Sequence, residues 1–448
     1  MRIADVAIVG AGAAGIAAAR DLAARGLQIV VLEARDRIGG RIETRRHPGV
    51  AVPAELGAEF IHGTPKETMR LVDGGGLLAV RIPDVHWFRT PHGFEERNFW
   101  QPLAGLLSRV PRSGRDVSAA DFLRSRRARA GAPLRKLVRS FVEGYHASAL
   151  DDVSARSIAM DRDDRAAGRA QFRILEGQDR VIEWLRSGIE PGAVEWRMGS
   201  PVTGIEWGAR AGVTLTDALG EAVRASAVLV TVPLGVLKAQ GGARGAIGFA
   251  PALPAAKRRA LAALAMGAVV KIVFRFDEPF WEREGFAARL RRGAGRDAGL
   301  VFFHAQGAPF PTWWTCAPAR APILTAWAGG PAANRLRAGK VPAAEVALST
   351  LADLLAMPRR ALAARVASAD SRDWTADPYA RGAYSHALPG GAGAARALGR
   401  PVAGRLFFAG EATSAEETGT VAGAIASGRR AAREIVSALG SGRRKRKG

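Results

Sequence analysis

The first apolar run of the chain predicts a strand, a turn, a helix and a second strand in immediate succession. Residues 3–9 are mostly apolar and β-branched with one early polar break, which is typical of a buried parallel strand. A glycine-rich turn follows, and residues 16–25 have a helical pattern that ends at Gly26. A second apolar strand over residues 28–32 ends at Glu33. A nucleotide-binding α/β unit requires this order of elements.

The turn itself has the sequence Gly10-Ala11-Gly12-Ala13-Ala14-Gly15. Gly10 permits a tight turn, Gly12 lets the backbone approach a pyrophosphate, and Gly15 lets the helix pack closely on the strand. The N-terminus of the helix presents unpaired N–H groups to an anion. Glu33 is placed to accept hydrogen bonds from the hydroxyls of an adenosine ribose. Together these features predict a dinucleotide site.

The residues after Glu33 favour FAD over NAD. The run 33–41 places the flexible pair Gly39-Gly40 beside basic side chains, just past the ribose-binding strand. A second glycine turn with nearby cations suits a longer, doubly charged ligand that is buried along its whole length. Arg41 is the most specific of these signals, because Arg35 and Arg37 could instead be solvated in so arginine-rich a chain.

Composition changes this picture little. The chain has 448 residues, of which 48% are hydrophobic and 24% charged, as expected of a globular protein with two or three domain-sized cores. The single cysteine, Cys316, excludes an intramolecular disulfide framework and a multi-cysteine zinc site. The histidines show no zinc-binding spacing, so the sequence predicts no metal site.

The formal net charge of +23 leaves two interpretations open. Of the 65 basic residues, eight are lysines and the other 57 are arginines, which resembles a compositional bias that merely produces a solvated basic surface. The alternative is a polyanion partner, drawn to this surface or to a basic, disordered tail over residues 441–448. We expect no specific nucleic-acid partner.

Targeting signals are not apparent. The chain begins directly with the first strand, and no apolar window reaches the length of a membrane span. We therefore expect a cytoplasmic protein without a membrane partner.

Several ordered blocks of the sequence resemble the flavin-containing amine oxidase family, which includes monoamine oxidases, polyamine oxidases and lysine-specific histone demethylases. The blocks are residues 33–41, 55–63, 230–238, 267–281, 406–411 and 420–424. The resemblance implies an α/β fold in which a Rossmann-like FAD-binding domain is interleaved with an α+β substrate domain built on a mixed sheet. No inserted helical hairpin or histone-reading domain is visible, which argues against a demethylase role.

The resemblance and the glycine motif together assign a set of residues to FAD binding. They are Gly10, Gly12, Ala14, Gly15, Glu33, Ala34, Arg35, Gly40, Arg41, Gly57, Ala58, Glu59, Val202, Gly410, Glu411, Thr420 and Val421. By the resemblance, the helix that begins near Val421 points its positive end at the flavin ring.

Two positions depart from the monoamine oxidases. Ala383 stands where those enzymes carry a cysteine bound covalently to the flavin, so we expect FAD to be held without a covalent bond. Thr420 stands where they carry one tyrosine of an aromatic cage, as in the histone demethylases. Specificity for small aryl monoamines is therefore not expected.

The candidate catalytic residues are Lys271, Trp374, Tyr384 and His62. Lys271 places a charge within an apolar strand, where burying it is costly and therefore indicates a role. By the resemblance, Lys271 binds a water beside flavin N5 and assists reoxidation by O2. Trp374 and Tyr384 resemble the aromatic wall of the amine site. His62 matches a histidine near the substrate in animal polyamine oxidases, although a loop histidine without a role is the alternative.

The resemblance also implies the domain boundaries. The FAD-binding domain is expected to collect residues 1–75, 192–255 and 385–440, and the substrate domain to collect residues 76–191 and 256–384.

These observations predict an oxidase that passes a hydride from the α-carbon of a small-molecule amine to flavin N5. The imine then hydrolyses to a carbonyl compound, and O2 is reduced to H2O2. An L-amino-acid oxidase, a desaturase of the same superfamily and a non-catalytic basic flavoprotein that binds polyanions remain alternatives. We expect a monomer or a homodimer.

A polyamine substrate fits the motifs but conflicts with the net charge of +23, unless acidic residues face the substrate channel. The candidates for that position are Glu95, Glu96, Glu143 and Asp151.

Overall fold

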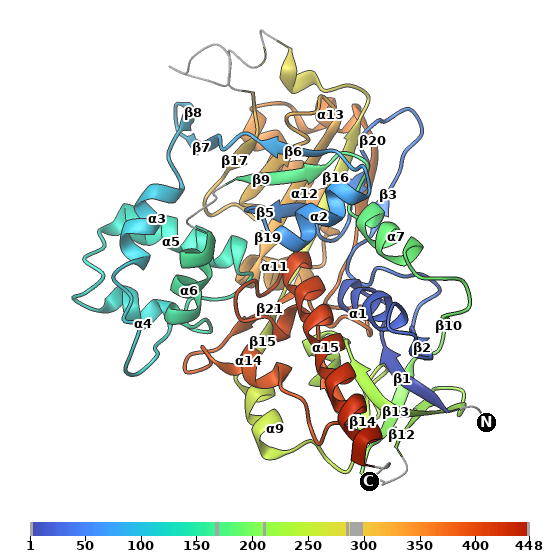
Figure 1. Ribbon diagram of the computed structural model, residues 1–448. Coiled ribbons are helices and arrows are strands. Elements are labelled where there is room, and N and C mark those ends of the chain that lie inside the picture. The colour runs from blue at the N-terminus through green and yellow to red at the C-terminus, as the bar shows by residue number, and fades with distance from the viewer. Residues whose placement is uncertain (1–2, 166–169, 209–211, 284–285, 287–298, 446–448) are drawn as a thin grey trace.

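A computed structural model describes residues 3–165, 170–208, 212–283, 286 and 299–445. Two large sheets dominate it, and helices cover both (Figure 1). The first sheet draws its strands from both ends and the middle of the chain, so distant segments of sequence lie side by side. The fold is therefore the interleaved α/β architecture that the sequence predicts.

The first sheet contains the predicted parallel strands. Its order is β10-β2-β1-β13-β12-β11-β14, and β22 also pairs with β13. The strands are β1 (Ala4–Val9), β2 (Ile29–Leu32), β10 (Val194–Arg197), β11 (Val202–Glu206), β12 (Val213–Asp217), β13 (Ala222–Val230), β14 (Gly248–Ala250) and β22 (Leu406–Phe408). Val6 and Ile8 of β1 pack in one core and Ala7 and Val9 in another, so this strand is buried on both faces.

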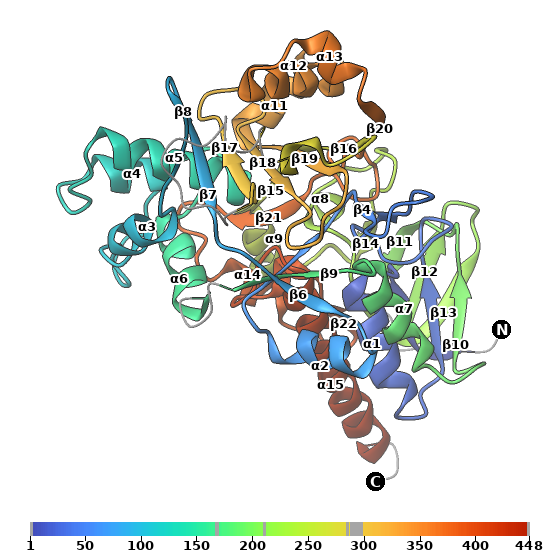
Figure 2. The same cartoon turned by 90° about the horizontal axis from the view of Figure 1, so that it is seen from above.

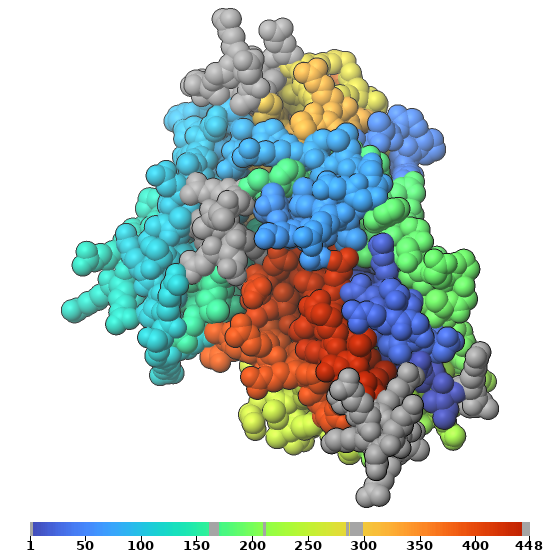
Figure 3. Space-filling view, viewed as in Figure 1, coloured from blue at the N-terminus to red at the C-terminus, as the bar shows by residue number. Residues whose placement is uncertain are grey.

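Four helices from different parts of the chain share a core with one face of this sheet. These helices are α1 (Ala13–Ala23), α2 (Lys66–Gly74), α7 (Asp179–Ser187) and α15 (Val421–Lys445). Figure 3 shows the N-terminal and C-terminal segments adjacent on one surface of the molecule. A methyl group added at Gly428 of α15 would lie 2.2 Å from the carbonyl oxygen of Ala14, so the two helices cross with no room for a side chain.

The second sheet is mixed, as predicted, with the order β20-β16-β19-β18-β17-β7-β8. Its strands are β7 (His86–Thr90), β8 (Gly93–Glu96), β16 (Val269–Phe276), β17 (Phe302–His304), β18 (Thr312–Thr315), β19 (Ile323–Gly329) and β20 (Val366–Ser371). β17 and β7 are parallel, and the other neighbours are antiparallel.

Helices pack against this second sheet in two groups (Figure 2). One group is α11 (Gly330–Ala338), α12 (Ala343–Leu355) and α13 (Arg359–Ala363), and it shares a core with alternate residues of the strands. The other group is α3 (Trp100–Leu107), α4 (Ala119–Arg124), α5 (Ala132–Tyr145) and α6 (Ala155–Arg165). This second group packs around Phe88 of β7.

Short elements connect the two large sheets. The strands are β3 (Thr44–Arg45), β4 (Ala54–Glu55), β5 (Phe60–His62), β6 (Ala79–Ile82), β9 (Gln171–Ile174), β15 (Leu264–Gly267) and β21 (Tyr384–Ala387). The helices are α8 (Leu234–Leu237), α9 (Ala255–Ala262), α14 (Ala394–Gly399) and two 3₁₀ turns, η1 (Phe280–Glu282) and η2 (Glu411–Thr413). β5 pairs with β9, and β15 pairs with β21, so short sheets cross the predicted domain boundaries. The division into domain segments stays a prediction.

The prediction of a disordered tail from residue 441 is wrong for its first five residues. α15 continues to Lys445, and residues 446–448 lie outside the described part. Arginine and lysine have high helix propensity, and extending a formed helix costs little compared with starting one. Within the described residues, none of the helices combines the length and apolar character needed to cross a bilayer.

The crossing of α1 and α15 generates a stability prediction. We expect Gly428→Ala to lower the free energy of unfolding by about 1–3 kcal/mol, because the backbone of Ala14 has to move. Gly440→Ala on the same helix is the matched control, since a methyl group there meets nothing within 4 Å. That control should be neutral or stabilising by about 0.5–1 kcal/mol. Urea titration measures both changes, and equal stability of the two variants would contradict the close crossing.

Candidate functional site

A cavity of about 380 Å³ lies between the two sheets and is lined by residues of both. Its lining begins at the glycine turn after β1 and continues past Lys271 of β16 to the helices α3 and α5. All of the predicted cofactor residues except Gly15, and all four predicted catalytic residues, line this cavity. The fold therefore brings together side chains from across the whole chain.

The turn after β1 has the geometry of a pyrophosphate site. Gly10 has a φ of 103°, which favours glycine, and a methyl group on Gly15 would lie 2.0 Å from the carbonyl oxygen of Gly10. A methyl group on Gly12 would meet nothing within 4 Å, so this face of the turn is open to a ligand. Gly12 is the N-cap of α1 and makes no side-chain cap, and the first turn carries no acidic residue. Its N–H groups are thus available to an anion.

Glu33 connects the end of β2 to this turn, and its predicted contact with a ribose stays a prediction. It lies at the end of β2 and is 4% exposed. One of its carboxylate oxygens accepts a hydrogen bond of 2.7 Å from the backbone N–H of Ala11, and the other accepts one of 3.0 Å from the N–H of Arg35. A carboxylate has further acceptor positions, so Glu33 retains the capacity to bind ribose hydroxyls.

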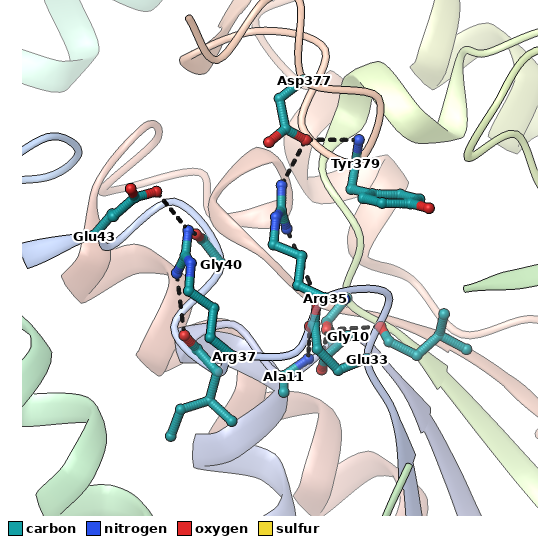
Figure 4. A network of polar contacts seen from close by, with 12 residues as sticks. Gly10, Ala11, Glu33, Arg35, Arg37, Gly40, Glu43, Asp377 and Tyr379 are labelled. Carbon is teal, nitrogen blue, oxygen red and sulfur yellow. Dashed lines mark hydrogen bonds and ion pairs between the residues drawn. The ribbon is translucent and has the colours of Figure 1, made fainter. Parts of the chain in front are cut away.

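The Arg35 side chain is paired within the protein rather than solvated (Figure 4). Its guanidinium donates to Asp377 Oδ1 at 2.7 Å and lies 5.6 Å from the ring centroid of Tyr379. Asp377 also accepts from the backbone N–H of Tyr379 at 2.8 Å. Because Arg35 ties this distant loop to the cavity wall, the alternative of a solvated Arg35 is wrong. Contact between Arg35 and FAD stays a prediction.

Arg37 is also paired and holds the second glycine turn. Its guanidinium donates to the carbonyl oxygen of Gly40 at 2.9 Å and to Glu43 at 2.9 Å (Figure 4). Gly39 and Gly40 have φ values of 98° and 60°, which a side chain would disfavour. The solvated interpretation of Arg37 is therefore wrong as well.

Arg41 and Glu411 form an ion pair of 2.9 Å at the cavity wall. The Arg41 guanidinium also donates to the carbonyl oxygen of Ala383 at 2.7 Å. The second oxygen of Glu411 accepts from the Ser385 hydroxyl at 2.6 Å and from the Gly419 N–H at 3.2 Å. The two predicted cofactor residues thus pair with each other and connect two further segments, residues 383–385 and the loop at Gly419.

The N-terminus of α15 faces the same cavity. The Thr420 hydroxyl accepts a hydrogen bond of 3.0 Å from the Gly423 N–H and so caps the helix, while it donates to the carbonyl oxygen of Glu417 at 2.8 Å. Val421, the first residue of the helix, lines the cavity beside it. The positive end of the helix dipole is therefore directed at the cavity.

The remaining predicted cofactor residues contribute backbone and small side chains to the lining. They are Ala14, Ala34, Gly57, Ala58, Val202 and Gly410. Gly57 has no room for a side chain, since an added methyl group would lie 1.9 Å from the carbonyl oxygen of Arg41. The sole cysteine, Cys316, is buried in a separate apolar cluster and does not line the cavity. The residues present therefore fit a dinucleotide that is held by non-covalent contacts.

Lys271 lies on the cavity face of β16 and is 3% exposed. Its ammonium donates to Glu59 Oε2 at 2.6 Å and to the carbonyl oxygen of Gly57 at 3.3 Å. The other oxygen of Glu59 accepts from Arg173 at 2.8 Å and from the Trp314 indole N–H at 2.9 Å. Glu59, predicted as a cofactor residue, is therefore also the ion-pair partner of Lys271 within an apolar strand.

The charge state of Glu59 follows from these contacts. Burial acts to raise the pKa of Glu59, but Lys271 and Arg173 outweigh burial and hold the pKa below its ordinary value. Two cations surround one carboxylate, so the cluster carries a net positive charge. Sequence analysis missed Arg173 and Trp314, because nothing in the sequence near either residue indicates a shared partner.

Trp374, Tyr384 and His62 form the rest of the predicted catalytic set. The Trp374 indole donates to the carbonyl oxygen of Leu56 at 3.0 Å, and the Tyr384 hydroxyl donates to the carbonyl oxygen of Tyr145 at 2.8 Å. The His62 ring lies 5.4 Å from the ring of Tyr145. These bonds fix the aromatic rings in the cavity wall, while the roles of the three residues stay predictions.

Besides Phe302 and Trp314, sequence analysis missed four other polar or aromatic cavity residues of the second sheet. They are His86, Thr312, His304 and Trp327. For Thr312 and His304 a weak signal exists, since each is a polar residue at the end of an otherwise aromatic segment, Thr-Trp-Trp in β18 and Phe-Phe-His in β17.

The acidic residues proposed for a polyamine channel do not line the cavity. Glu95, Glu143 and Asp151 pair instead with arginines outside it, and Glu96 is exposed. Within the described lining, the acidic residues are Glu33, Glu59 and Glu411. Each has partners of its own, so the described cavity offers no unpaired carboxylate to a second ammonium group.

A comparison with protein families identifies the chain. The family model described as flavin containing amine oxidoreductase matches residues 13–436, which is most of the sequence. The curated relatives include a lysine-specific histone demethylase 1 homolog 1 of Oryza sativa subsp. japonica, which is 29% identical over 97% of this chain but only 52% of its own length. The chain thus spans about half the length of that relative.

Another curated relative is similar over most of its own length. Polyamine oxidase 2 of Arabidopsis thaliana is 28% identical over 96% of this chain and 87% of that protein. Among solved structures, a putrescine oxidase bound to putrescine has a TM-score of 0.79 and 21% identity, covering 97% of this chain and 99% of that one. The cyclohexylamine oxidase of Brevibacterium oxydans has a TM-score of 0.78 and 22% identity, covering 98% of this chain and 100% of that one.

Glu55 of β4 generates a prediction about pH. Its buried carboxyl accepts hydrogen bonds of 2.7 Å from the Gln178 N–H and the Thr44 hydroxyl, and burial raises its pKa from 4.5 to about 7. Between these pH values the unfolded chain loses the proton first, so stability falls as pH rises. We expect Glu55→Gln to remove this loss. The free energy of unfolding of the variant minus that of the parent should therefore be about 3 kcal/mol larger at pH 8 than at pH 4.

Urea titration at several pH values measures this difference. Glu96→Gln is the control, because Glu96 is exposed and should leave the pH dependence as it is in the parent. If the free energy of unfolding of Glu55→Gln changes with pH as that of the parent does, Glu55 is ionised in the native protein.

Proposed function

The chain belongs to the flavin-containing amine oxidoreductase family, and from this premise we propose that it is an oxidase of small amines that uses O2. The observation that carries the proposal is the position of Lys271. This buried ammonium on the second sheet shares one cavity with the dinucleotide turn of the first sheet.

Bound FAD supplies the acceptor for a hydride from the amine α-carbon and passes the electrons on to O2, which yields H2O2. The N-terminus of α1 holds the pyrophosphate, and Glu33 accepts from the ribose hydroxyls. Arg41 and Glu411 fix the segments around the remaining part of the dinucleotide. The N-terminus of α15 stabilises negative charge placed beside it.

The aromatic wall controls the protonation of the substrate. Trp374, Tyr384 and Trp327 present mostly apolar surface and exclude water from the amine. An ammonium group is costly to desolvate without a carboxylate, so the amine binds in its neutral form, which is the form that can lose a hydride. The product imine then leaves and hydrolyses in water.

Lys271 assists the oxygen half of the reaction. Together with Arg173 it gives the cluster around Glu59 a net positive charge, which favours the negative charge that develops as O2 is reduced. Two acceptors bind its ammonium, which leaves the third N–H for a water molecule at the reacting centre.

The lining favours amines over amino acids. A carboxylate substrate needs a cationic clamp, and the arginines of the described lining are Arg35 and Arg41. Both are already paired, with Asp377 and Glu411 respectively. The expected localisation in the cytoplasm and the expected monomer or homodimer remain predictions.

A panel of substrates tests the function. We expect a small amine, but not the amino acid that yields it by decarboxylation, to bleach the flavin absorption band under anaerobic conditions. Readmitted air should restore the band, and one molecule of H2O2 should form for each reduced flavin that is reoxidised. Bleaching by the amino acid alone would identify an amino-acid oxidase. Recovery of the band without H2O2 would exclude an oxidase, and a protein that takes up FAD but is bleached by no amine would contradict the proposal.

Lys271→Met tests the oxygen step separately. We expect anaerobic reduction by the amine to persist, while the rate of flavin reoxidation by O2 falls about 100-fold, because the cation beside the reacting centre is lost. Stopped-flow mixing of reduced protein with aerated buffer measures this rate. Lys238→Met is the control, since Lys238 donates to the carbonyl oxygen of Leu264 and does not line the cavity. Unchanged oxygen reactivity in Lys271→Met would remove the role assigned to this residue.

A further inference from the structure

One row of residues crosses the cavity face of the second sheet. Lys271 of β16 is opposite Trp327 of β19, Trp327 is opposite Thr312 of β18, and Thr312 is opposite His304 of β17. Residues directly opposite in register share a face, and all four line the cavity. Three steps between strands place the backbone of His304 about 14 Å from that of Lys271. The row therefore runs from the reacting end of the cavity to its far end.

The four residues next to the row, which point to the other face of the same strands, are all apolar. Ile272, Ala326, Trp313 and Phe303 alternate with the row residues and pack in the core beneath α12. Packing of the sheet thus requires apolar residues on that face only. The polar groups at Thr312 and His304 need a separate explanation, because they stand in an otherwise aromatic wall.

Hydrogen bonds connect this far end to the surface. His304 Nε2 lies 3.0 Å from His86 Nδ1, and His86 Nε2 lies 3.0 Å from Asp84 Oδ1. Asp84 has a side chain that is 45% exposed, and it also accepts from the Trp100 indole N–H at 2.9 Å. The Thr312 hydroxyl lies 3.4 Å from His304 Nδ1, which is long for a hydrogen bond.

The carboxylate at the outer end sets the direction of the chain. Asp84 can only accept, so His86 donates to it through Nε2 and, when neutral, accepts through Nδ1. With His86 in this neutral state, His304 donates to it through Nε2, which leaves His304 Nδ1 as an acceptor beside Thr312. The chain thus ends at the cavity in a nitrogen that accepts a hydrogen bond.

The surroundings keep His304 neutral. Its ring is 7% exposed and stacks with Phe88 at 4.7 Å and with Phe99 at 5.5 Å between centroids. Burial, with a smaller effect of His86, lowers the pKa of His304 well below its ordinary value.

We propose that His304 and Thr312 form a subsite for a neutral hydrogen-bond donor, and that the substrate class is an amine with a hydroxyl group at the end remote from the oxidised carbon. This inference rests on the proposed function and names the substrate of that same site. An apolar end would leave His304 Nδ1 with the long contact to the Thr312 hydroxyl and no hydrogen bond from the substrate. A second ammonium would lie in an aromatic shell whose nearest carboxylate in this chain of contacts, Asp84, is separated from it by two imidazole rings.

Matched ligands test the subsite in two ways. The substrates are linear alkylamines, amino alcohols and diamines of equal chain length, compared by kcat/KM across a series of lengths. The ligands for binding are analogues of the same three types whose α-carbon carries no hydrogen, so that calorimetry of the FAD-loaded protein measures Kd without turnover. At the best length we expect the amino alcohol to exceed the alkylamine about tenfold in both measurements, and to exceed the diamine by more.

Variants then locate the preference. His304→Phe keeps an aromatic ring in the stack, and Thr312→Val keeps the shape of the side chain. If one of the two variants fails to fold, the other still measures the preference. In each variant we expect the ratio between amino alcohol and alkylamine to fall toward one, in binding as well as in kcat/KM. His92→Phe is the control, because His92 is exposed on the turn between β7 and β8, and it should keep the ratio of the parent.

The failures are distinguishable. Equal binding and turnover of amino alcohol and alkylamine in the parent, or a preference that survives both variants, would overturn the subsite. A preference for diamines would overturn it in favour of an ammonium stabilised through Asp84. If no amine reduces the flavin although the analogues bind with the expected ratio, the proposed function fails and the subsite stands.

Discussion

The buried ion pair between Lys271 and Glu59 joins the wall of the second sheet to the segment that follows the cofactor turns. Its Nζ–Oε2 distance is 2.6 Å, and the side chains are 3% and 9% exposed. Removing one partner of such a pair leaves an uncompensated buried charge, which typically costs about 3–5 kcal/mol. The arrangement of Arg173, Trp314 and the backbone of Gly57 around the pair therefore depends on both residues being present. The ion pair also provides the cavity with a cation, the Lys271 ammonium, which hydrogen bonds to Glu59 and to the carbonyl oxygen of Gly57 hold in position.

Charge is distributed very differently inside and outside the cavity. The formal net charge of +23 comes from a large excess of arginine, yet the arginines that line the cavity are each committed to a carboxylate. Arg35 and Arg41 thereby act as ties between distant segments, and the far end of the cavity is left to neutral aromatic and imidazole rings. The strongly basic composition thus says little about the ligand, because the cavity selects by local pairing and burial rather than by net charge.

The predictions that hold concern features that depend on residues close in sequence. The strand, glycine turn and helix at the N-terminus lie where the pattern predicts, as β1, Gly10 to Gly15 and α1, because each depends on residues close in sequence. The same is true of the capped start of α15 beside Thr420. The basic tail was misjudged, because high charge alone does not end a helix once it has formed. Arg37 was left as a possible solvated residue, although its partners are only a few positions away, because composition masked them.

Sequence alone was sufficient to predict the dinucleotide turn, the family of the chain and the candidate residues Lys271, Trp374, Tyr384 and His62. These follow from local patterns and from ordered motifs along the chain. Only the tertiary structure decided that Glu59 holds Lys271, that Arg35 reaches Asp377, and that His304 is opposite Thr312 in register. Partners such as Arg35 and Asp377 lie hundreds of positions apart, and strand order and register brought them together. Those depend on how whole sheets pack, which no single segment of sequence encodes.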